Sequence, residues 1–375
     1  MIYLDYSANT PVDTRVLEQF CAVERRCIGN ANSHHQAGSA AKAEIDAATI
    51  KIASLLGVQP AEIIYTSGAS EANNFALKGL ARLSRHAGRH IISTPLEHSS
   101  VSGTLTALQE QGYEIDLLNV KQDGTVDLEH LKDLLRPDTI CVAITLVDSE
   151  LGVVQPVQEI AAILKAYSHC HLHVDATQAV GKIPVSFEGV DTMSLTAHKF
   201  YGLNGIGLLI KRRNLALEPL IHGGESTTIY RSGTPTVALA SSLACALDLA
   251  VTDLPGRVDH VARLNAELRA ALSTYPLVRI NSPDHAIPHV LNLSVRNVKG
   301  TVFQRELDAK GVCVSVKSAC SSDGLPSRAV FAVSRDRRNA LSSWRISLSH
   351  LTTEDEIKAF LQAFDVCYRE LTAVH

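Results

Sequence analysis

The 375-residue sequence lacks the features of a membrane or secreted protein. It contains no run of 18 or more apolar residues, and residues 1–5 have neither the basic nor the apolar region of a signal peptide. It also lacks a charge imbalance, because 35 lysines and arginines stand against 39 aspartates and glutamates, for a net charge of -4. Such a chain has no overall field that gathers anionic lipid or nucleic acid. We therefore expect a cytosolic, cytoplasmic protein without membrane contact, and we expect no direct nucleic-acid contact.

Cysteine pairs at metal-binding or disulfide spacing are missing as well. None of the eight cysteines forms a C-x-x-C motif, which argues against a zinc site and a disulfide scaffold. His169, His171 and His173 alternate along a predicted strand and so share one face, but no carboxylate or cysteine at ligand spacing joins them. We expect no metal site. Most cysteines are expected to be small buried residues, with one used in chemistry.

The composition and the order of apolar segments predict a folded α/β protein. A hydrophobic share of 46%, a charged share of 20% and the lack of repeats exclude a largely disordered chain. Up to about residue 255, short apolar runs alternate with amphipathic stretches, which predicts βαβ units and a mostly parallel sheet covered by helices on both faces. The predicted strands are 62–65, 90–93, 114–118, 140–146, 171–175, 192–195 and 207–210, and the predicted helices include 71–83, 101–111, 128–135 and 157–166.

After residues 254–256 the pattern changes. A helical stretch at 257–272 leads to short alternating strands at 278–280, 290–295 and 312–316, and a final helix is predicted from 353 to about 370. No linker rich in proline or serine separates the two parts. We therefore predict a smaller α+β domain that packs firmly on the first.

Four polar features follow predicted strands, at the edge where parallel sheets bind ligands. Lys199 lies among small residues beside a glycine-rich turn, where a partly desolvated lysine suits Schiff-base chemistry. Asp175 ends an apolar strand and there needs a cationic partner, such as a protonated pyridine nitrogen. Residues 66–71 run from a strand into a helix N-terminus, which suits a phosphate. His98 supplies an imidazole that can stack on a ring or move protons.

Each of these features also has a structural explanation. Lys199 can be a surface lysine, Asp175 an N-cap and His98 a hydrogen-bonded core histidine, while 66–71 can be a plain capping turn. Together, however, a lysine, an anion site, an acid and an imidazole at one sheet edge are what pyridoxal 5'-phosphate requires. We therefore predict an enzyme that uses this cofactor.

At this point the sequence resembles the cysteine desulfurases of the NifS/IscS-like group, within the class V aminotransferase fold. The resemblance covers nearly the whole chain and lies in residues 3–12, 29–38, 66–71, 97–98, 173–181, 197–199, 231–234, 318–322 and 344–347. It implies PLP-dependent fold type I, with a large domain at 15–255 and a small domain formed by 1–14 and 256–375. It also implies a homodimer in which Thr234 reaches the cofactor phosphate of the neighbouring subunit.

The resemblance also assigns roles to single residues. Lys199 resembles the Schiff-base lysine, Asp175 the partner of the pyridine nitrogen, and His98 the stacking residue and proton shuttle. Gln178 resembles the residue that bonds the phenolic oxygen. The positions that match phosphate ligands within one chain are Ala69, Ser70, Thr196 and His198. The positions that match substrate-holding residues are Asn32, Ser149 and Arg345, of which the arginine grips the carboxylate by a two-point contact.

Cys320 matches the catalytic cysteine of the family, within the run Ser-Ala-Cys-Ser-Ser. A thiolate on a mobile polar loop can reach a cofactor and then leave, whereas Cys313 lies in an alternating segment and is expected to be buried. The implied reaction has Lys199 removing the α-proton of L-cysteine and Cys320 attacking the substrate sulfur. Alanine leaves, and a persulfide stays on Cys320 for a protein sulfur acceptor. Inert packing is the alternative for any single cysteine.

Three segments depart from the family pattern. Asp148-Ser149-Glu150 stands where the family has Asn-Asn-Glu, so Ser149 replaces an amide and Asp148 is expected to add a negative charge. Segment 223–229 loses glycines and a basic residue of a loop that adjoins the partner subunit's site. Four arginines follow Cys320 and form either a docking patch for an acidic acceptor or nucleic acid, or a solvated helix face. They are Arg328, Arg335, Arg337 and Arg338.

These departures favour a specialised desulfurase that serves one pathway, such as DNA phosphorothioation or tRNA thiolation. Two alternatives stay open. A selenocysteine lyase or an aminotransferase of the same fold would keep its activity without Cys320, and a catalytically impaired scaffold or partner subunit would keep the fold without turnover.

Overall fold

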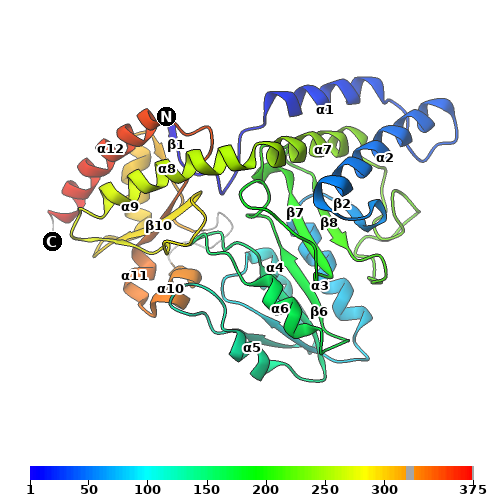
Figure 1. The fold of residues 1–375 in the computed structure, drawn as a ribbon, viewed down its shortest axis with the longest axis horizontal. Helices are drawn as coiled ribbons and strands as arrows, with labels where there is room; N and C mark the ends of the chain where they lie inside the picture. The colour runs from blue at the N-terminus through cyan, green and yellow to red at the C-terminus, as the bar shows by residue number, and fades with distance from the viewer. Residues whose placement is uncertain (318–324, 374–375) are drawn as a thin grey trace.

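The structure, a computed structural model, describes residues 1–317 and 325–373 and is built around a seven-stranded sheet (Figure 1). The strand order is β2-β8-β7-β6-β5-β3-β4. The strands are β2 (Ile63–Thr66), β3 (His90–Ser93), β4 (Glu114–Leu117), β5 (Thr139–Thr145), β6 (His171–Asp175), β7 (Thr192–Thr196) and β8 (Gly207–Lys211). β8 runs antiparallel to both of its neighbours, and the other pairs are parallel. The predicted α/β fold with a mostly parallel sheet is confirmed.

Helices cover both faces of this sheet. Val142 and Ile144 of β5 pack into a core shared with α2, α6 and α7, whereas Ala143 packs into a second core with α3 and α4. Because both faces are buried, the strands read as continuous apolar runs. The helices of this part are α1 (Thr14–Arg26), α2 (Gln36–Leu56), α3 (Ala69–Leu83), α4 (Ser99–Gln109), α5 (Leu128–Leu134), α6 (Val157–Leu164) and α7 (Val237–Thr252).

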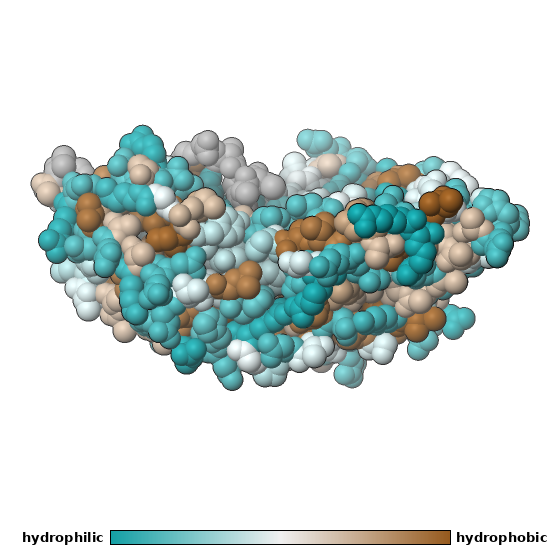
Figure 2. Space-filling model, turned by 90° about the horizontal axis from the view of Figure 1, so that it is seen from above, coloured by the Kyte–Doolittle hydropathy of each residue, from teal (hydrophilic) through white to brown (hydrophobic). Residues whose placement is uncertain are grey.

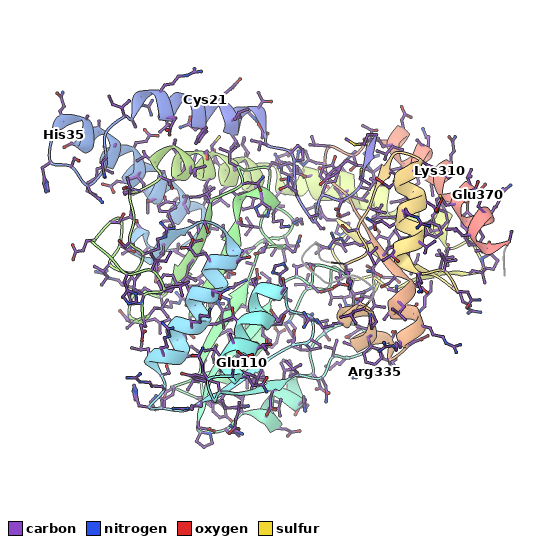
Figure 3. All side chains as sticks on the ribbon, turned by 180° about the vertical axis from the view of Figure 1, so that it is seen from behind. Cys21, His35, Glu110, Lys310, Arg335 and Glu370 are labelled. Carbon is purple, nitrogen blue, oxygen red and sulfur yellow. The ribbon has the colours of Figure 1, made fainter. Side chains whose placement is uncertain are left out.

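A second, antiparallel sheet has the order β12-β10-β9 and a core of its own. Its strands are β9 (Val278–Ile280), β10 (Val290–Val295) and β12 (Ser343–Ser347), and the helices around it are α8 (Leu254–Leu272), α9 (Gly300–Ala309), α10 (Arg328–Ser334), α11 (Arg337–Ser342) and α12 (Glu354–Thr372). Within that core Phe303 stacks on Trp344, with ring centroids 5.1 Å apart. Lys310 and Glu370 form an ion pair of 3.3 Å at the outer edge (Figure 3).

The N-terminus joins this second part of the molecule. β1 (Ile2–Tyr3) pairs in parallel with β11 (Val312–Cys313), and Asp5 bridges to Ser347 at the end of β12. In Figure 1 both termini lie on the side of the small sheet, and α8 leads to it from α7. The division into domains near residue 255 stays a prediction.

The segment around Cys313 differs from the prediction. Residues 312–316 form a strand only at β11, and Cys313 is partly exposed instead of buried. The reason is alternation, because Val312 and Val314 on either side point into the small core. Of the seven described cysteines, the buried ones are Cys141, Cys170 and Cys367, so the expectation that most are buried is wrong for this part of the chain.

The two parts of the molecule meet through a separate apolar cluster. Leu96 and Leu151 from the large sheet's loops pack against Ala329 and Val330 of α10. Elsewhere, on the face seen in Figure 2, apolar side chains lie in separate groups among polar ones. Among the described helices none is by itself long and apolar enough to span a membrane, and α7 with α8 meets that test only as a pair bent by 65°.

Candidate active site

A cavity of about 320 Å³ lies beyond the carboxyl ends of the parallel strands. Its lining comes from loops that follow β2, β3, β5, β6 and β7, together with the N-terminal segment and β12. Parallel sheets bind ligands at this edge because the strand ends and the following helix N-termini converge there. The lining residues that the sequence predicted are Ala69, Ser70, His98, Ser149, Asp175, Gln178, Thr196, His198, Lys199 and Arg345.

Lys199 ends a short 3-10 turn, Ala197–Lys199, directly after β7. Its Nζ donates to the carbonyl oxygens of Ser7 at 2.7 Å and Ala8 at 2.6 Å. The N-terminal segment, nearly 200 residues away in sequence, therefore holds this amine at the cavity wall. The amine is partly buried and lines the cavity, where a nucleophilic lysine would meet its ligand.

Asp175 lies at the end of β6 and is 4% exposed. Its Oδ2 accepts a hydrogen bond from Asn73 Nδ2 at 2.8 Å, and its Oδ1 accepts one from the Thr177 N–H at 2.9 Å. Asn73 Oδ1 in turn accepts from Ser194 Oγ at 2.5 Å and lies 3.0 Å from Nε2 of His173. These neutral partners orient the carboxylate but leave its charge for a cation in the cavity.

His173 completes this network behind the cavity. Burial lowers its pKa to about 4, so the imidazole is neutral. Nδ1 lies 2.9 Å from Thr192 Oγ1, and Nε2 faces the oxygen of Asn73, which places the proton on Nε2. His173 is therefore part of the core network and, within the described residues, no group of side chains that could hold a metal ion includes it. Asn73 itself was missed by the sequence analysis; its signal is a polar residue on the buried face of α3.

The anion site predicted at 66–71 forms the N-terminus of α3. Gly68 precedes the helix with φ +154°. A Cβ on Gly207 would lie 2.7 Å from the Gly68 Cα, which is too close for any residue with a side chain. The glycine at the start of β8 thus lets this strand approach the N-terminus of α3 closely. Thr196 Oγ1 lies 3.1 Å from His198 Nδ1 on the same side. Burial and the nearby Lys199 lower the pKa of His198 to about 4, so this ring is neutral.

His98 is the N-cap of α4. Its Nδ1 accepts from the Ser100 N–H at 3.1 Å, so the ring proton lies on Nε2 when the imidazole is neutral. Burial lowers the pKa of His98, the charge of Asp175 opposes that shift, and Lys199 and Arg328 add to it. The ring therefore lines the cavity as a neutral imidazole whose Nε2–H can donate a hydrogen bond.

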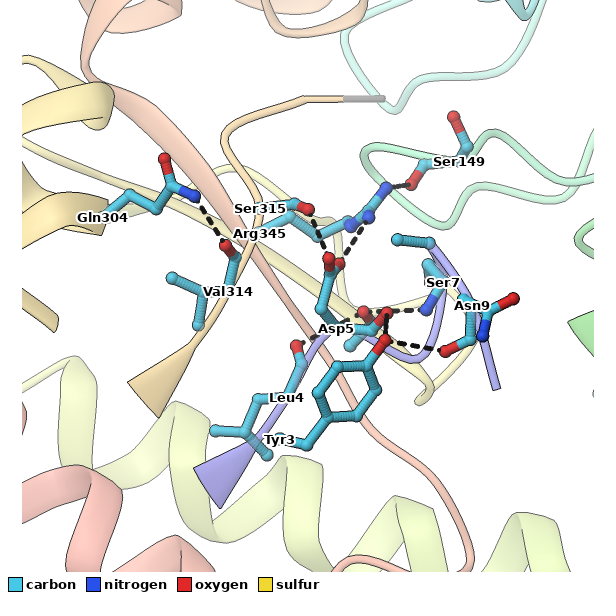
Figure 4. Close-up of polar contacts among 12 residues, drawn as sticks. Tyr3, Leu4, Asp5, Ser7, Asn9, Ser149, Gln304, Val314, Ser315 and Arg345 are labelled. Atoms are coloured by element: carbon cyan, nitrogen blue, oxygen red, sulfur yellow. Dashed lines mark hydrogen bonds and ion pairs between the residues drawn. The ribbon is translucent and has the colours of Figure 1, made fainter. Parts of the chain in front are cut away.

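Arg345 on β12 is 1% exposed and lines the same cavity, and Figure 4 shows its polar contacts. Its Nη2 pairs with Asp5 Oδ1 at 3.0 Å, and its Nη1 donates to the carbonyl oxygen of Ser149 at 2.7 Å. Ser315 Oγ donates to the other oxygen of Asp5 at 2.7 Å. Nε of Arg345 is buried without a hydrogen-bond partner among the described residues. Ser149 thus positions the arginine through its main chain.

Asp148 and the partly exposed Glu150 lie near this arginine, and Glu97 is buried near Asp148. Burial raises the pKa of Glu97 to about 8, and burial together with Glu150 raises the pKa of Asp148 to about 7. The pKa of Glu150 is raised by burial too. Burial thus opposes the negative charge that Asp148 is expected to add, and that expectation stays a prediction. Oδ1 of Asp148 and Oε2 of Glu97 have no partner within the described part of the chain.

Two predicted site residues lie elsewhere. Asn32 lines a different depression, beside residues 225–228, and Thr234 is exposed in the loop before α7. A single chain does not bring either of them to Lys199. Cys320 and its neighbours at 318–324 lie outside the described residues.

The four arginines that follow Cys320 are divided by the fold. Arg328 donates to the Glu97 carbonyl at 3.1 Å and so lies where the two parts of the molecule meet. Arg335 is exposed at the lower edge of the small sheet's helices (Figure 3), and Arg337 is exposed too. Arg338 lines a concave surface of about 420 Å³ together with other cations. These cations are Arg279, Arg296 and Lys299.

The comparisons with known proteins agree with one another. The model of the aminotransferase class-V family matches residues 2–360. The chain is 40% identical to the cysteine desulfurase IscS of Proteus mirabilis over 365 residues, which cover 95% of this chain and 90% of that protein. The solved structure of a NifS-like protein matches with a TM-score of 0.92 at 35% identity, over 99% of each chain. The structure of SspA in complex with cysteine matches with a TM-score of 0.83 at 30% identity, over 94% of this chain and 100% of that one.

Proposed function

The chain belongs to the aminotransferase class-V family, in its NifS/IscS-like group of cysteine desulfurases, and from this premise we propose that it removes sulfur from L-cysteine with pyridoxal 5'-phosphate as cofactor. The observation that carries the proposal is the cavity itself. It combines the Lys199 amine, the oriented carboxylate of Asp175, the neutral His98 ring and the buried guanidinium of Arg345.

The residues present fit the cofactor. Asp175 has neutral hydrogen-bond partners and lines the cavity, where a pyridinium would be its cationic partner, while the N-terminus of α3 with Thr196 and His198 would hold the phosphate. Thr177 Oγ1 is buried at the cavity without a partner among the described residues, as expected of a group that meets a ligand. When bound, the cofactor supplies an electron sink for bonds at the substrate α-carbon.

The protein's own side chains then have distinct tasks. Arg345 binds the carboxylate of L-cysteine through the positive charge and the remaining N–H donors of its guanidinium, which lines the cavity. Lys199 and the neutral His98 hold and move the α-proton and the thiol proton. Cys320 would take the substrate sulfur, with its S–S bond forming as the substrate Cβ–S bond breaks. Protons returned to the substrate carbons complete alanine, and the persulfide waits for a protein acceptor.

Alanine formation tests this proposal. Purified protein loaded with the cofactor is incubated with L-cysteine, and alanine and protein persulfide are measured for the wild type, Cys320→Ala and Cys313→Ala. We expect alanine from the wild type and from Cys313→Ala, whose partly exposed thiol serves as the matched control. Cys320→Ala should lose turnover but keep the cofactor absorption. Undiminished turnover in Cys320→Ala would favour a selenocysteine lyase or an aminotransferase, and no alanine from any protein would favour an impaired subunit.

The acceptor is a protein with an acidic docking surface. Support comes from the concave surface that Arg338 shares with Arg279, Arg296 and Lys299, whose side chains form no ion pair within the described residues. Opposite charge on a partner would speed and orient docking there.

We also propose that the enzyme supplies sulfur to one pathway, such as DNA phosphorothioation or tRNA thiolation. Equal sulfur transfer to an unrelated iron–sulfur scaffold would contradict that specialisation. The homodimer and the cytosolic location stay predictions.

A further inference from the structure

A buried lysine next to the active site has no task in the reaction described so far. Lys182 is 6% exposed and lies in the loop after β6. Its Nζ donates to Oε1 of Gln178 at 3.0 Å. Burying an amine is costly unless the group serves a purpose that a smaller or apolar residue would not.

Gln178 is held from two sides by this arrangement. Its Oε1 accepts from Lys182, and its Nε2 donates to the Ser7 carbonyl at 2.9 Å. Ser7 O is the same atom that accepts from Lys199. A flipped amide would turn its NH₂ group toward the donor Lys182 and its oxygen toward the acceptor carbonyl of Ser7. Both contacts would become repulsive while the amine is protonated, so below its pKa, which burial lowers to about 7, the orientation of this amide is set.

Within the described residues, Lys182 forms no ion pair with a carboxylate. Behind Lys199 a small void is lined by Lys182 and by further basic or phenolic groups. The titratable and charged groups there are Tyr6, Lys199, Tyr201, Arg257, His289 and His350. Burial lowers the pKa of His289 to about 3 and of His350 to about 4, so both rings are neutral. The Gln178 oxygen is thus the acceptor that the structure provides for this amine.

We infer that Lys182 is a positioning residue, which holds the amide of Gln178 with its NH₂ group toward the cavity so that this group can donate to the phenolic oxygen of the cofactor. The inference rests on the proposed function. It assigns the lysine no contact with the substrate or with the reacting atoms. One N–H of Gln178 is used by Ser7, and the second is available to the ligand.

The test compares Lys182→Met, Lys182→Gln and Gln178→Ala with the wild type. Each protein is prepared without cofactor, and the dissociation constant of added pyridoxal 5'-phosphate and the absorption spectrum of the bound form are measured across pH. Lys182→Met removes the donor and should weaken cofactor binding roughly tenfold, the loss of about one hydrogen bond, with a shifted absorption band. Lys182→Gln keeps a neutral donor and should restore most of the cofactor affinity and most of the wild-type absorption spectrum.

The double variant Lys182→Met/Gln178→Ala separates positioning from a general structural effect. If the lysine acts through the amide, Lys182→Met should change neither affinity nor spectrum further once Gln178 is gone. Additive losses would overturn the inference, as would a Lys182→Met protein that matches the wild type. A wild type that does not bind the cofactor at all would instead refute the proposed function, and the inference with it.

Discussion

Replacing Asp148 by asparagine is expected to stabilise the protein at neutral and alkaline pH. The side chain is fully buried, and its Oδ2 accepts hydrogen bonds from the N–H groups of Glu150, at 3.2 Å, and Leu151. An asparagine has nearly the same shape and can accept the same two bonds with its oxygen. The substitution therefore removes the ionisable group while it keeps the local turn.

The magnitude follows from the pKa of the aspartate. Burial, with a contribution from Glu150, raises that pKa from its ordinary value of 3.8 to about 7. Because the folded state binds the proton more tightly than the unfolded state, this group makes stability fall as the pH rises from 3.8 to about 7. Above that window the ionised group costs on the order of 4 kcal/mol, at about 1.4 kcal/mol per pKa unit.

Urea unfolding of both proteins at a series of pH values measures this effect. Asp148→Asn should gain on the order of 4 kcal/mol over the wild type at pH 8 and almost nothing near pH 4. For a chain of this length the gain at pH 8 corresponds to a rise in melting temperature of about 5 °C. Asp133→Asn, at an exposed position of α5, is the control and should show no pH-dependent difference. A constant difference between Asp148→Asn and the wild type at all pH values would refute the reasoning.

Two further predictions concern the cavity. Arg345→Lys keeps a positive charge but loses the fork that contacts both Asp5 and Ser149. Steady-state kinetics should therefore show the KM for L-cysteine raised by roughly tenfold or more, with a smaller change in kcat, and an unchanged KM would contradict this prediction. Asn73→Ala leaves Asp175 and His173 without their shared partner and should lower the free energy of unfolding by about 2–3 kcal/mol and weaken cofactor binding. Denaturant unfolding and a cofactor titration measure both, and a loss of stability without a loss of affinity would argue against the orienting role of Asn73.

The parts of the fold that the sequence predicts well are those with strong local patterns. Strands 90–93, 171–175, 278–280 and 290–295 lie where the apolar runs predicted them, because each is short, buried and bounded by polar or turn residues. β12 was not predicted as a strand. Ser343, Arg345 and Ser347 alternate with two apolar residues, but the run is only five residues long, and its register is set by pairing with β10, about 50 residues earlier in the chain.

In the candidate site, too, the residues that a local sequence pattern marks were predicted, and those that depend on distant contacts were not. Lys199, Asp175 and His98 follow strands, so topology alone brings them to one edge of the sheet. Asn73 and Lys182 act through other side chains, and neither has a local motif that reveals it. The protonation of Asp148 could not be read from its residue type, because its pKa depends on burial that the fold creates.

The N-terminal segment explains why this site requires the whole chain. Asp5 pairs with Arg345 of the small sheet, while the carbonyls of Ser7 and Ala8 hold Lys199 at the end of the large sheet's β7. β1 is itself paired with β11, so one extended segment of about ten residues contacts both parts of the molecule. The two ends of an amino-acid substrate would be met by Arg345 and by Lys199, and their spacing is set by this segment. Neither sheet with its helices contains a complete site, and the geometry at the reacting atoms therefore depends on contacts that span nearly the full length of the sequence.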